Sequence, residues 1–257
     1  MTELATSDFP PWAVTLTTIM VALGILVAVV VAIDVVRRPQ PMGVMNVVWP
    51  VTALFGSVLW GAAYLRWGRA PRPEDGSHDA PAGHGAGQSA GQGAGHATPM
   101  PVAVFKGTSH CGAGCMLGDL LVEWLVVLTP ALAVLGGYDW LFADRIYAVW
   151  VLDYVAAFAI GIAFQYFAIA PMRGLGLRAG VRAAVKADAL SITAWQVGMY
   201  GTMALVQLWW LPEVLGGRAA VTTPVFWAAM QVAMVVGFAT SYPVNWWLVR
   251  SGVKERM

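Results

Sequence analysis

One stretch of this sequence places side chains that can bind metal or carry protons at regular helical intervals. Within SHCGAGCMLGDLLVEW, Cys111, Cys115, Asp119 and Glu123 follow one another every four residues, and His110 precedes the first cysteine. Because four residues turn an α-helix by only about 40° more than one revolution, these side chains lie on one face. Thiolates beside an imidazole suit Cu(I) or Zn(II), and carboxyls can accept protons or hold a cation. The pattern predicts a metal uptake site at the membrane boundary, formed by His110, Cys111 and Cys115.

A packing role for the two cysteines stays open beside this hypothesis. Gly112, Gly114 and Gly118 lie between and after them, and small residues allow membrane helices to approach closely. Buried cysteine also behaves as a small apolar side chain. A single His-Cys-x-x-x-Cys motif offers three ligands at most, so a metal would need others from elsewhere in the chain.

Two pairs of methionines repeat the four-residue spacing near the C-terminus. They are Met199 with Met203 and Met230 with Met234. Thioethers favour Cu(I), and the Met-x-x-x-Met spacing resembles that of the copper-uptake channels of eukaryotes. If the two helices are antiparallel neighbours, the pairs lie at similar depth. Ordinary core packing is the alternative explanation.

Several further polar residues fall inside apolar stretches, where each needs a partner, a cavity or a pathway. We expect Asp153 and Asp188, together with Asp119 and Glu123, to carry protons or a cation. The amides could equally act as hydrogen-bonding links between helices. Beyond Asp119 and Glu123, the polar residues inside apolar stretches are Asp153, Gln165, Asp188, Gln196, Gln231 and Asn245.

These residues require helices that cross a membrane. The chain is 58% hydrophobic and 11% charged, whereas soluble domains are about 25% charged. A net charge of +1 offers no basic surface for nucleic acid. A span needs about 20 apolar residues, which predicts an all-α polytopic bundle of about six transmembrane helices. Their expected ranges are 12–36, 44–65, 116–135, 146–169, a fifth helix ending near 210, and 224–249.

The expected organisation has three parts. Residues 1–69 form two N-terminal transmembrane helices, and residues 106–257 form a four-helix membrane domain. Between them, residues 70–105 contain APAGHGAGQSAGQGAGHA, a composition that buries too little apolar surface to fold. We therefore expect a disordered loop, with its histidines in a solvated linker: His78, His84 and His96.

Basic residues predict the orientation in the membrane. Arg178, Arg182 and Lys186 form one helical stripe that suits lipid headgroups. Counting all six expected spans, lysines and arginines divide eleven to four, which places both termini in the cytoplasm and the protein in a bacterial cytoplasmic membrane. Arg37 and Arg38 argue against this orientation, because it puts them outside.

The sequence also resembles a known family. Its motifs HCGAGCMLGD, FQYFAIAPM followed by KADALSITAWQVGMYG, and MQVAMVVGFATSYPVNWWLVRSGVKERM are similar to a bacterial family catalogued only as a domain of unknown function. The resemblance covers about residues 106–257 and implies a multi-span membrane protein without implying an activity. The characteristic residues it implies here are His110, Cys111, Cys115, Asp119, Gln165, Lys186, Asp188, Gln196, Tyr242, Pro243, Asn245 and Trp246.

The leading functional hypothesis is a permease or channel-like transporter for a soft metal ion, with copper favoured and Cu(I) or Zn(II) as the ions bound. The alternatives are a membrane-embedded thiol redox or metal-delivery protein, and a structural membrane subunit. The sequence contains no nucleophile elbow, HExxH, P-loop or dinucleotide motif, so an enzyme is not favoured. The expected partners are the lipid bilayer, a metal ion and a second copy of the chain, without nucleic acid.

Overall fold

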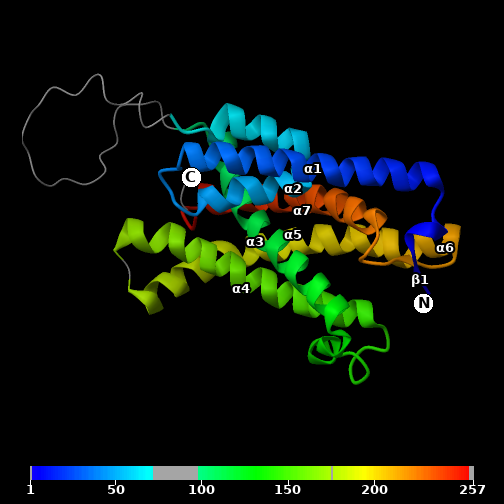
Figure 1. Ribbon diagram of the computed structural model, residues 1–257. Coiled ribbons are helices and arrows are strands. Elements are labelled where there is room, and N and C mark those ends of the chain that lie inside the picture. Colours follow the sequence, from blue (N-terminus) through cyan, green and yellow to red (C-terminus); the bar gives the residue numbers. More distant parts are fainter. Residues whose placement is uncertain (1, 72–97, 175, 255–257) are drawn as a thin grey trace, which may run out of the picture.

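The computed structural model describes residues 2–71, 98–174 and 176–254, and these form a helical bundle (Figure 1). A pair of two-residue strands joins the N-terminus to the segment before the last helix. The elements in chain order are β1 (Glu3–Leu4), η1 (Thr6–Asp8), α1 (Pro11–Arg37), α2 (Met45–Ala63), η2 (Tyr64–Gly68), α3 (Met100–Leu128), η4 (Pro130–Gly136), α4 (Arg145–Arg173), α5 (Leu177–Ala204), η5 (Leu205–Trp210), α6 (Leu211–Leu215), β2 (Arg218–Ala219) and α7 (Pro224–Arg250).

Five helical segments of the described chain are long and apolar enough to cross a membrane, which is compatible with a multi-pass membrane protein. They are Pro11–Arg37, Met45–Gly68, Met100–Leu128, Arg145–Ile169 and Pro224–Arg250. Helix α1 exposes a row of large apolar side chains that water would disfavour and lipid would not. That row includes Leu16, Ile19, Leu23, Leu26 and Val30. Helix α5 is not among the five.

The second of these segments folds back on itself as a helical hairpin. Ser57 has φ 46° and ψ −129°, which interrupts the helix. The rings of Trp49 and Tyr64 have centroids 5.5 Å apart, although a straight helix would separate these residues by about 22 Å. Arg69, just after the hairpin, pairs with Asp34 near the end of α1 at 2.8 Å. The segment therefore begins and ends at the same end of the bundle, and the prediction of a straight span over 44–65 is corrected.

Side chains from two other helices hold the hairpin inside the bundle. Gln231 of α7 donates from Nε2 to the carbonyl oxygen of Leu54 at 2.7 Å. Trp60 donates from Nε1 to the hydroxyl of Ser109 in α3 at 3.0 Å. Because backbone carbonyls near a chain reversal need donors when water is excluded, the Gln231 amide links helices here.

The hairpin changes the relation between the two termini. Helices α1 and α7 run in the same direction, and the N- and C-terminal labels lie at opposite ends of the bundle in Figure 1. The expectation of both termini on one side counted residues 44–65 as a crossing. With the hairpin in place of that crossing, the two ends of the described chain lie at opposite ends of the bundle.

Helix α3 begins at Met100, sixteen residues before the predicted start at 116. Its first half is rich in Gly, Ser and Thr, which lowers hydropathy, and this half is buried against other helices rather than in lipid. The helix ends at Leu128, and residues 130–136 form the 3-10 helix η4. Residues 100–105 thus belong to a helix and not to the predicted loop. Residues 72–97 of that loop, with His78, His84 and His96, lie outside the described residues.

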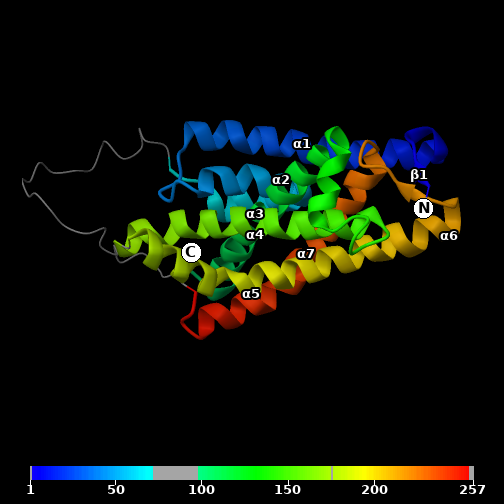
Figure 2. The ribbon, with the colours of Figure 1, turned by 90° about the horizontal axis from the view of Figure 1, so that it is seen from below.

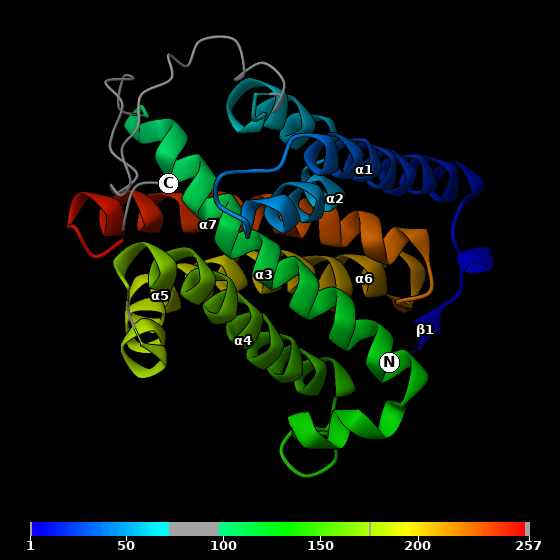
Figure 3. The same cartoon turned by 60° about the vertical axis from the view of Figure 1, so that its left-hand side comes forward.

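Small residues bring α3 and α4 into close contact. A Cβ added to Gly114 would lie 2.7 Å from the Cα of Gly161, and one added to Gly118 would lie 2.5 Å from the backbone nitrogen of Ala157. Figure 2 shows α4 beside α5, and Figure 3 shows α3 crossing the bundle. Gly114 and Gly118 therefore allow the close contact between α3 and α4 that the packing alternative expected of glycines beside the cysteines.

Candidate functional site

A lysine from the C-terminal tail enters the interior of the bundle. After α7, Gly252 adopts φ 73° and turns the chain back, and the Lys254 amide donates to the Leu248 carbonyl at 3.1 Å. The Lys254 side chain then passes between α3, α5 and α7, where the residue is 2% exposed. An ammonium group so deeply buried requires a counter-charge.

Four acceptor atoms surround this ammonium group. Its Nζ lies 2.5 Å from Asp188 Oδ1, 2.8 Å from Asn245 Oδ1, 3.1 Å from Cys111 Sγ and 3.4 Å from the Gly107 carbonyl oxygen. Burial alone would lower the pKa of Lys254, but the charge of Asp188 and the contact with Cys111 outweigh burial and raise it. At 2.5 Å from Asp188 Oδ1, the Lys254 ammonium forms a buried ion pair.

Hydroxyl groups complete the cluster around Cys111. The thiol donates to Asp188 Oδ1 at 2.9 Å, and Ser191 donates to the Cys111 sulfur at 3.0 Å. Asn245 Nδ2 contacts Ser191 Oγ at 2.5 Å, and Ser241 donates to the Ser191 carbonyl oxygen at 2.9 Å. Residues from α3, α5, α7 and the tail thus form one hydrogen-bonded network.

Three carboxyl groups lie further along α3 and α4. Asp119, Glu123 and Asp153 are all buried. Among the described residues, no hydrogen-bond partner contacts either oxygen of Asp119 or Asp153. The Gln196 amide of α5 lies beside Asp119. Such carboxyls are costly in a membrane interior unless a proton or cation neutralises them.

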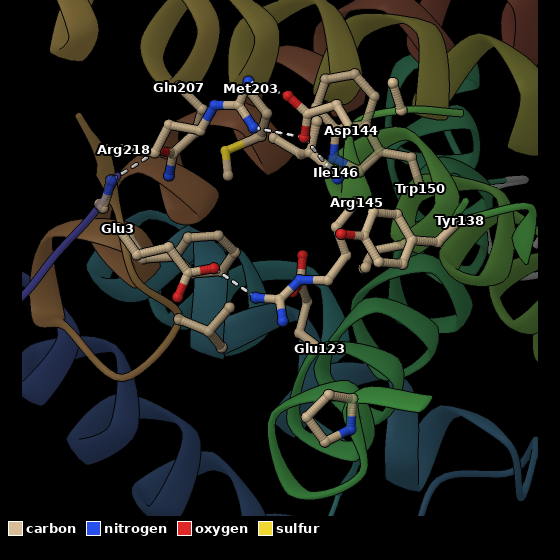
Figure 4. A pocket seen from close by; sticks show the side chains of 16 residues that line it. Glu3, Glu123, Tyr138, Asp144, Arg145, Ile146, Trp150, Met203, Gln207 and Arg218 are labelled. Carbon is tan, nitrogen blue, oxygen red and sulfur yellow. Dashed lines mark hydrogen bonds and ion pairs between the residues drawn. The ribbon is translucent and has the colours of Figure 1, made fainter. Parts of the chain in front are cut away.

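A pocket of about 450 Å³ opens at the other end of the bundle (Figure 4). Arg218 pairs with Asp144 through two hydrogen bonds of 2.6 and 2.8 Å, which lower the pKa of Asp144. Arg145 pairs with Glu3 of β1, and Glu123 lies beside Arg145. The remaining lining includes Tyr138, Trp150, Met203, Gln207 and Phe226.

These groups together form a line through the bundle. Glu123, Asp119, Cys115 and Cys111 occupy successive turns of α3, a rise of about 18 Å, and all four are buried. Glu123 lines the pocket, and Cys111 contacts Lys254. We call the set Glu123, Asp119, Asp153, Cys115, Cys111 and Asp188 the polar line. The predicted inward orientation of the cysteine and carboxyl face is confirmed.

The residues predicted to bind metal at the membrane boundary, His110, Cys111 and Cys115, are buried inside the bundle. Cys111 is eleven residues inside α3, and both cysteines are buried free thiols. His110 packs beside Phe164, with ring centroids 6.0 Å apart, and neither of its nitrogens has a hydrogen-bond partner in the described chain. Within residues 2–71, 98–174 and 176–254, no three His, Cys, Asp or Glu side chains form a group that could hold a metal ion. Cys111 therefore lies within a helix and not before the start of one, as the predicted span 116–135 had placed it.

The other predicted residues divide between core and surface. The four methionines are buried in the apolar core, and Met234 Sδ accepts a hydrogen bond from Trp195 at 3.3 Å. Gln165 is buried, and its Oε1 has no partner in the described part of the chain. The basic stripe lies exposed on α5: Arg178, Arg182 and Lys186.

Sequence reasoning missed three members of the cluster. Lys254 reads as one more charge in a basic tail, and nothing local indicates that it turns inward. Ser191 and Ser241 did carry a signal, because Ser191 is three residues after Asp188 and Ser241 is four before Asn245. Each pair shares one helical face.

The cluster, the polar line and the α3–α4 contact all lie within one region of family similarity. Neither a curated protein nor a solved structure matches the chain. The family described as "Domain of unknown function (DUF4396)" matches residues 94–254, an interval that starts six residues before α3 and includes Lys254. The chain therefore belongs to the DUF4396 family.

Proposed function

We propose that this protein is a cation permease, in which the ion or its coupled proton moves along the polar line between the pocket and the Asp188–Lys254 pair. The observation that carries this proposal is the pair of buried carboxyls, Asp119 and Asp153, whose oxygens lack partners in the described chain. A purely structural carboxyl would be expected to have donors around it.

The thiols on the polar line favour a soft metal ion, Cu(I) above all, as the cargo. A cation that moves along α3 meets Cys115 and Cys111 on adjacent turns, and each sulfur lies one turn from the next donor group. Sulfur ligands select Cu(I) over hard cations. Asp119, Asp153 and Asp188 would then balance the charge of the ion with protons.

We also propose an orientation, based on the hairpin. Among the described residues, Arg145 and Arg218 are the only lysines or arginines at the pocket end of the bundle. The others lie near the helix ends at the opposite end of the bundle. The excess of basic residues on the cytoplasmic side places Lys254 and the basic stripe in the cytoplasm. In this orientation the pocket and the N-terminus face outward. Arg37 and Arg38 then lie on the cytoplasmic side, in agreement with the excess of basic residues expected there.

Reconstituted flux tests the proposal. The protein is placed in liposomes that contain a soft-metal chelator dye and, separately, a pH dye. We expect uptake of Cu(I) or Ag(I) above empty liposomes, with a fall of at least tenfold in Asp119→Asn/Asp153→Asn. Glu213→Gln, which changes an exposed acid of α6, should retain the flux.

Three outcomes contradict the permease. They are wild-type flux no greater than that of empty liposomes for protons and soft cations, unchanged flux in the folded double variant, and an equal loss in Glu213→Gln. The redox alternative instead expects Cys111 and Cys115 to change oxidation state during turnover without flux. The structural-subunit alternative expects neither activity.

A further inference from the structure

We propose that Cys111, Asp188, Asn245 and the Gly107 carbonyl form a binding site for a soft monovalent cation, and that Lys254 is a tethered cation that occupies the site until the ion displaces it. This inference rests on the proposed function and deepens it, because it assigns the site at which the cargo binds and a device that guards it.

The first support is that the acceptors belong to the bundle while the cation belongs to the tail. Gly107 and Cys111 come from α3, Asp188 from α5 and Asn245 from α7, and all converge on one Nζ atom at 2.5 to 3.4 Å. Three oxygens and one sulfur around a single positive charge are also the surroundings that a bound metal cation needs. Without Lys254, the negative charge of Asp188 would be buried in this site without a counter-ion.

The second support is the nature of the ligands. A thiol in the site favours Cu(I) or Ag(I) over Na⁺ and K⁺, and the single negative charge that the site offers favours a monovalent ion over a divalent one. The Cys111 thiol already donates to Asp188 Oδ1 at 2.9 Å. A proton acceptor is therefore in place for the thiol when a metal approaches the sulfur.

The exchange balances in charge and protons. The metal–sulfur bond forms as the Cys111 S–H bond breaks, and the proton moves to Asp188 Oδ1. The thiolate and the ion then neutralise each other, Asp188 is neutral, and no counter-charge remains for the ammonium of Lys254. The side chain leaves with its charge towards water, so that the buried site stays neutral overall.

The position of Lys254 allows this movement without unfolding a helix. It follows the end of α7 by four residues, and Gly252 with φ 73° supplies a turn between them. Among the described residues, the hydrogen bonds that hold the tail are those of the backbone amides of residues 251–254 to the last turn of α7 and those of the Lys254 side chain itself. Loss of the ion pair therefore removes the main interaction that keeps the side chain inside.

Equilibrium binding of Ag(I), a soft ion that air does not oxidise, tests the site in purified protein. In a Cys115→Ala background, we expect Lys254→Gln and Lys254→Met to bind Ag(I) at least tenfold more tightly than the parent. Lys186→Gln removes an exposed lysine two residues before Asp188 and should leave the affinity unchanged. Cys111→Ser should abolish this binding, and Na⁺ and K⁺ should not compete.

A threefold or smaller change in the folded Lys254 variants, or binding that survives Cys111→Ser, would overturn the inference. If the Lys254 variants do not fold, trypsin provides the readout in the parent protein. Ag(I) should accelerate cleavage after Lys254 at least fivefold, because the released side chain becomes accessible, and unchanged cleavage overturns the inference. Binding is measured without flux, so a protein that binds Ag(I) but transports nothing would contradict only the permease.

Discussion

The buried polar side chains divide into two kinds by their hydrogen bonding. In the cluster around Lys254, the ammonium group lies within 3 Å of Asp188 Oδ1 and Asn245 Oδ1, and only Asp188 Oδ2 lacks a partner in the described chain, whereas both oxygens of Asp119 and of Asp153 lack one. Satisfied networks rigidify a core, while unsatisfied carboxyls need a proton or an ion. The same residue types therefore serve two purposes, which only their surroundings distinguish.

At the residue scale, the close approach of α3 and α4 makes Gly118 sensitive to substitution. Gly118→Ala places a Cβ about 2.5 Å from the Ala157 backbone nitrogen, so the helices must separate at a cost of about 1–3 kcal/mol. We expect a lower melting temperature in detergent. Gly201→Ala is the matched control, because that helical glycine has nothing within 4 Å of an added Cβ. Equal melting of the two variants would contradict the observed contact.

At the element scale, the hairpin depends on one residue in a conformation that side chains rarely adopt. Ser57 has φ 46°, and its buried hydroxyl lacks a partner in the described chain. Backbone strain of this kind costs of the order of 1–3 kcal/mol.

Ser57→Gly should therefore raise the melting temperature by about 2–4 °C. Ser7→Gly, at an exposed position of η1 without positive φ, should produce no increase. A decrease in Ser57→Gly would mean that the turn does not require a left-handed conformation.

How far the sequence predicts these elements depends on what each one faces. Helices α1, α4 and α7 expose apolar side chains along much of their length, so hydropathy identifies them to within a few residues at most ends. The first half of α3 faces other helices and is built from small and polar residues, which hydropathy does not recognise. Residues 44–65 are mostly apolar, and the reversal at Ser57 does not interrupt their hydropathy. The inward turn of Lys254 depends on long-range contacts and was likewise invisible.

At the scale of the whole molecule, the number of crossings decides which loops share a side. Surface cysteines at Ser7→Cys, Gly43→Cys and Ser251→Cys report this in sealed vesicles with a membrane-impermeant maleimide, since all three positions are exposed and the native cysteines are buried. We expect positions 43 and 251 to react from one side and position 7 from the other. A straight second span would instead group positions 7 and 251, which would refute the hairpin.

The pairing of β1 with β2 has a practical consequence for anyone who handles the protein. Glu3 aligns with Arg218, and Leu4 with Ala219, so the first residues form part of the rim of the pocket. An affinity tag or fluorescent fusion attached there would crowd the mouth of the pocket, while one attached after residue 257 would pull on the tail that carries Lys254.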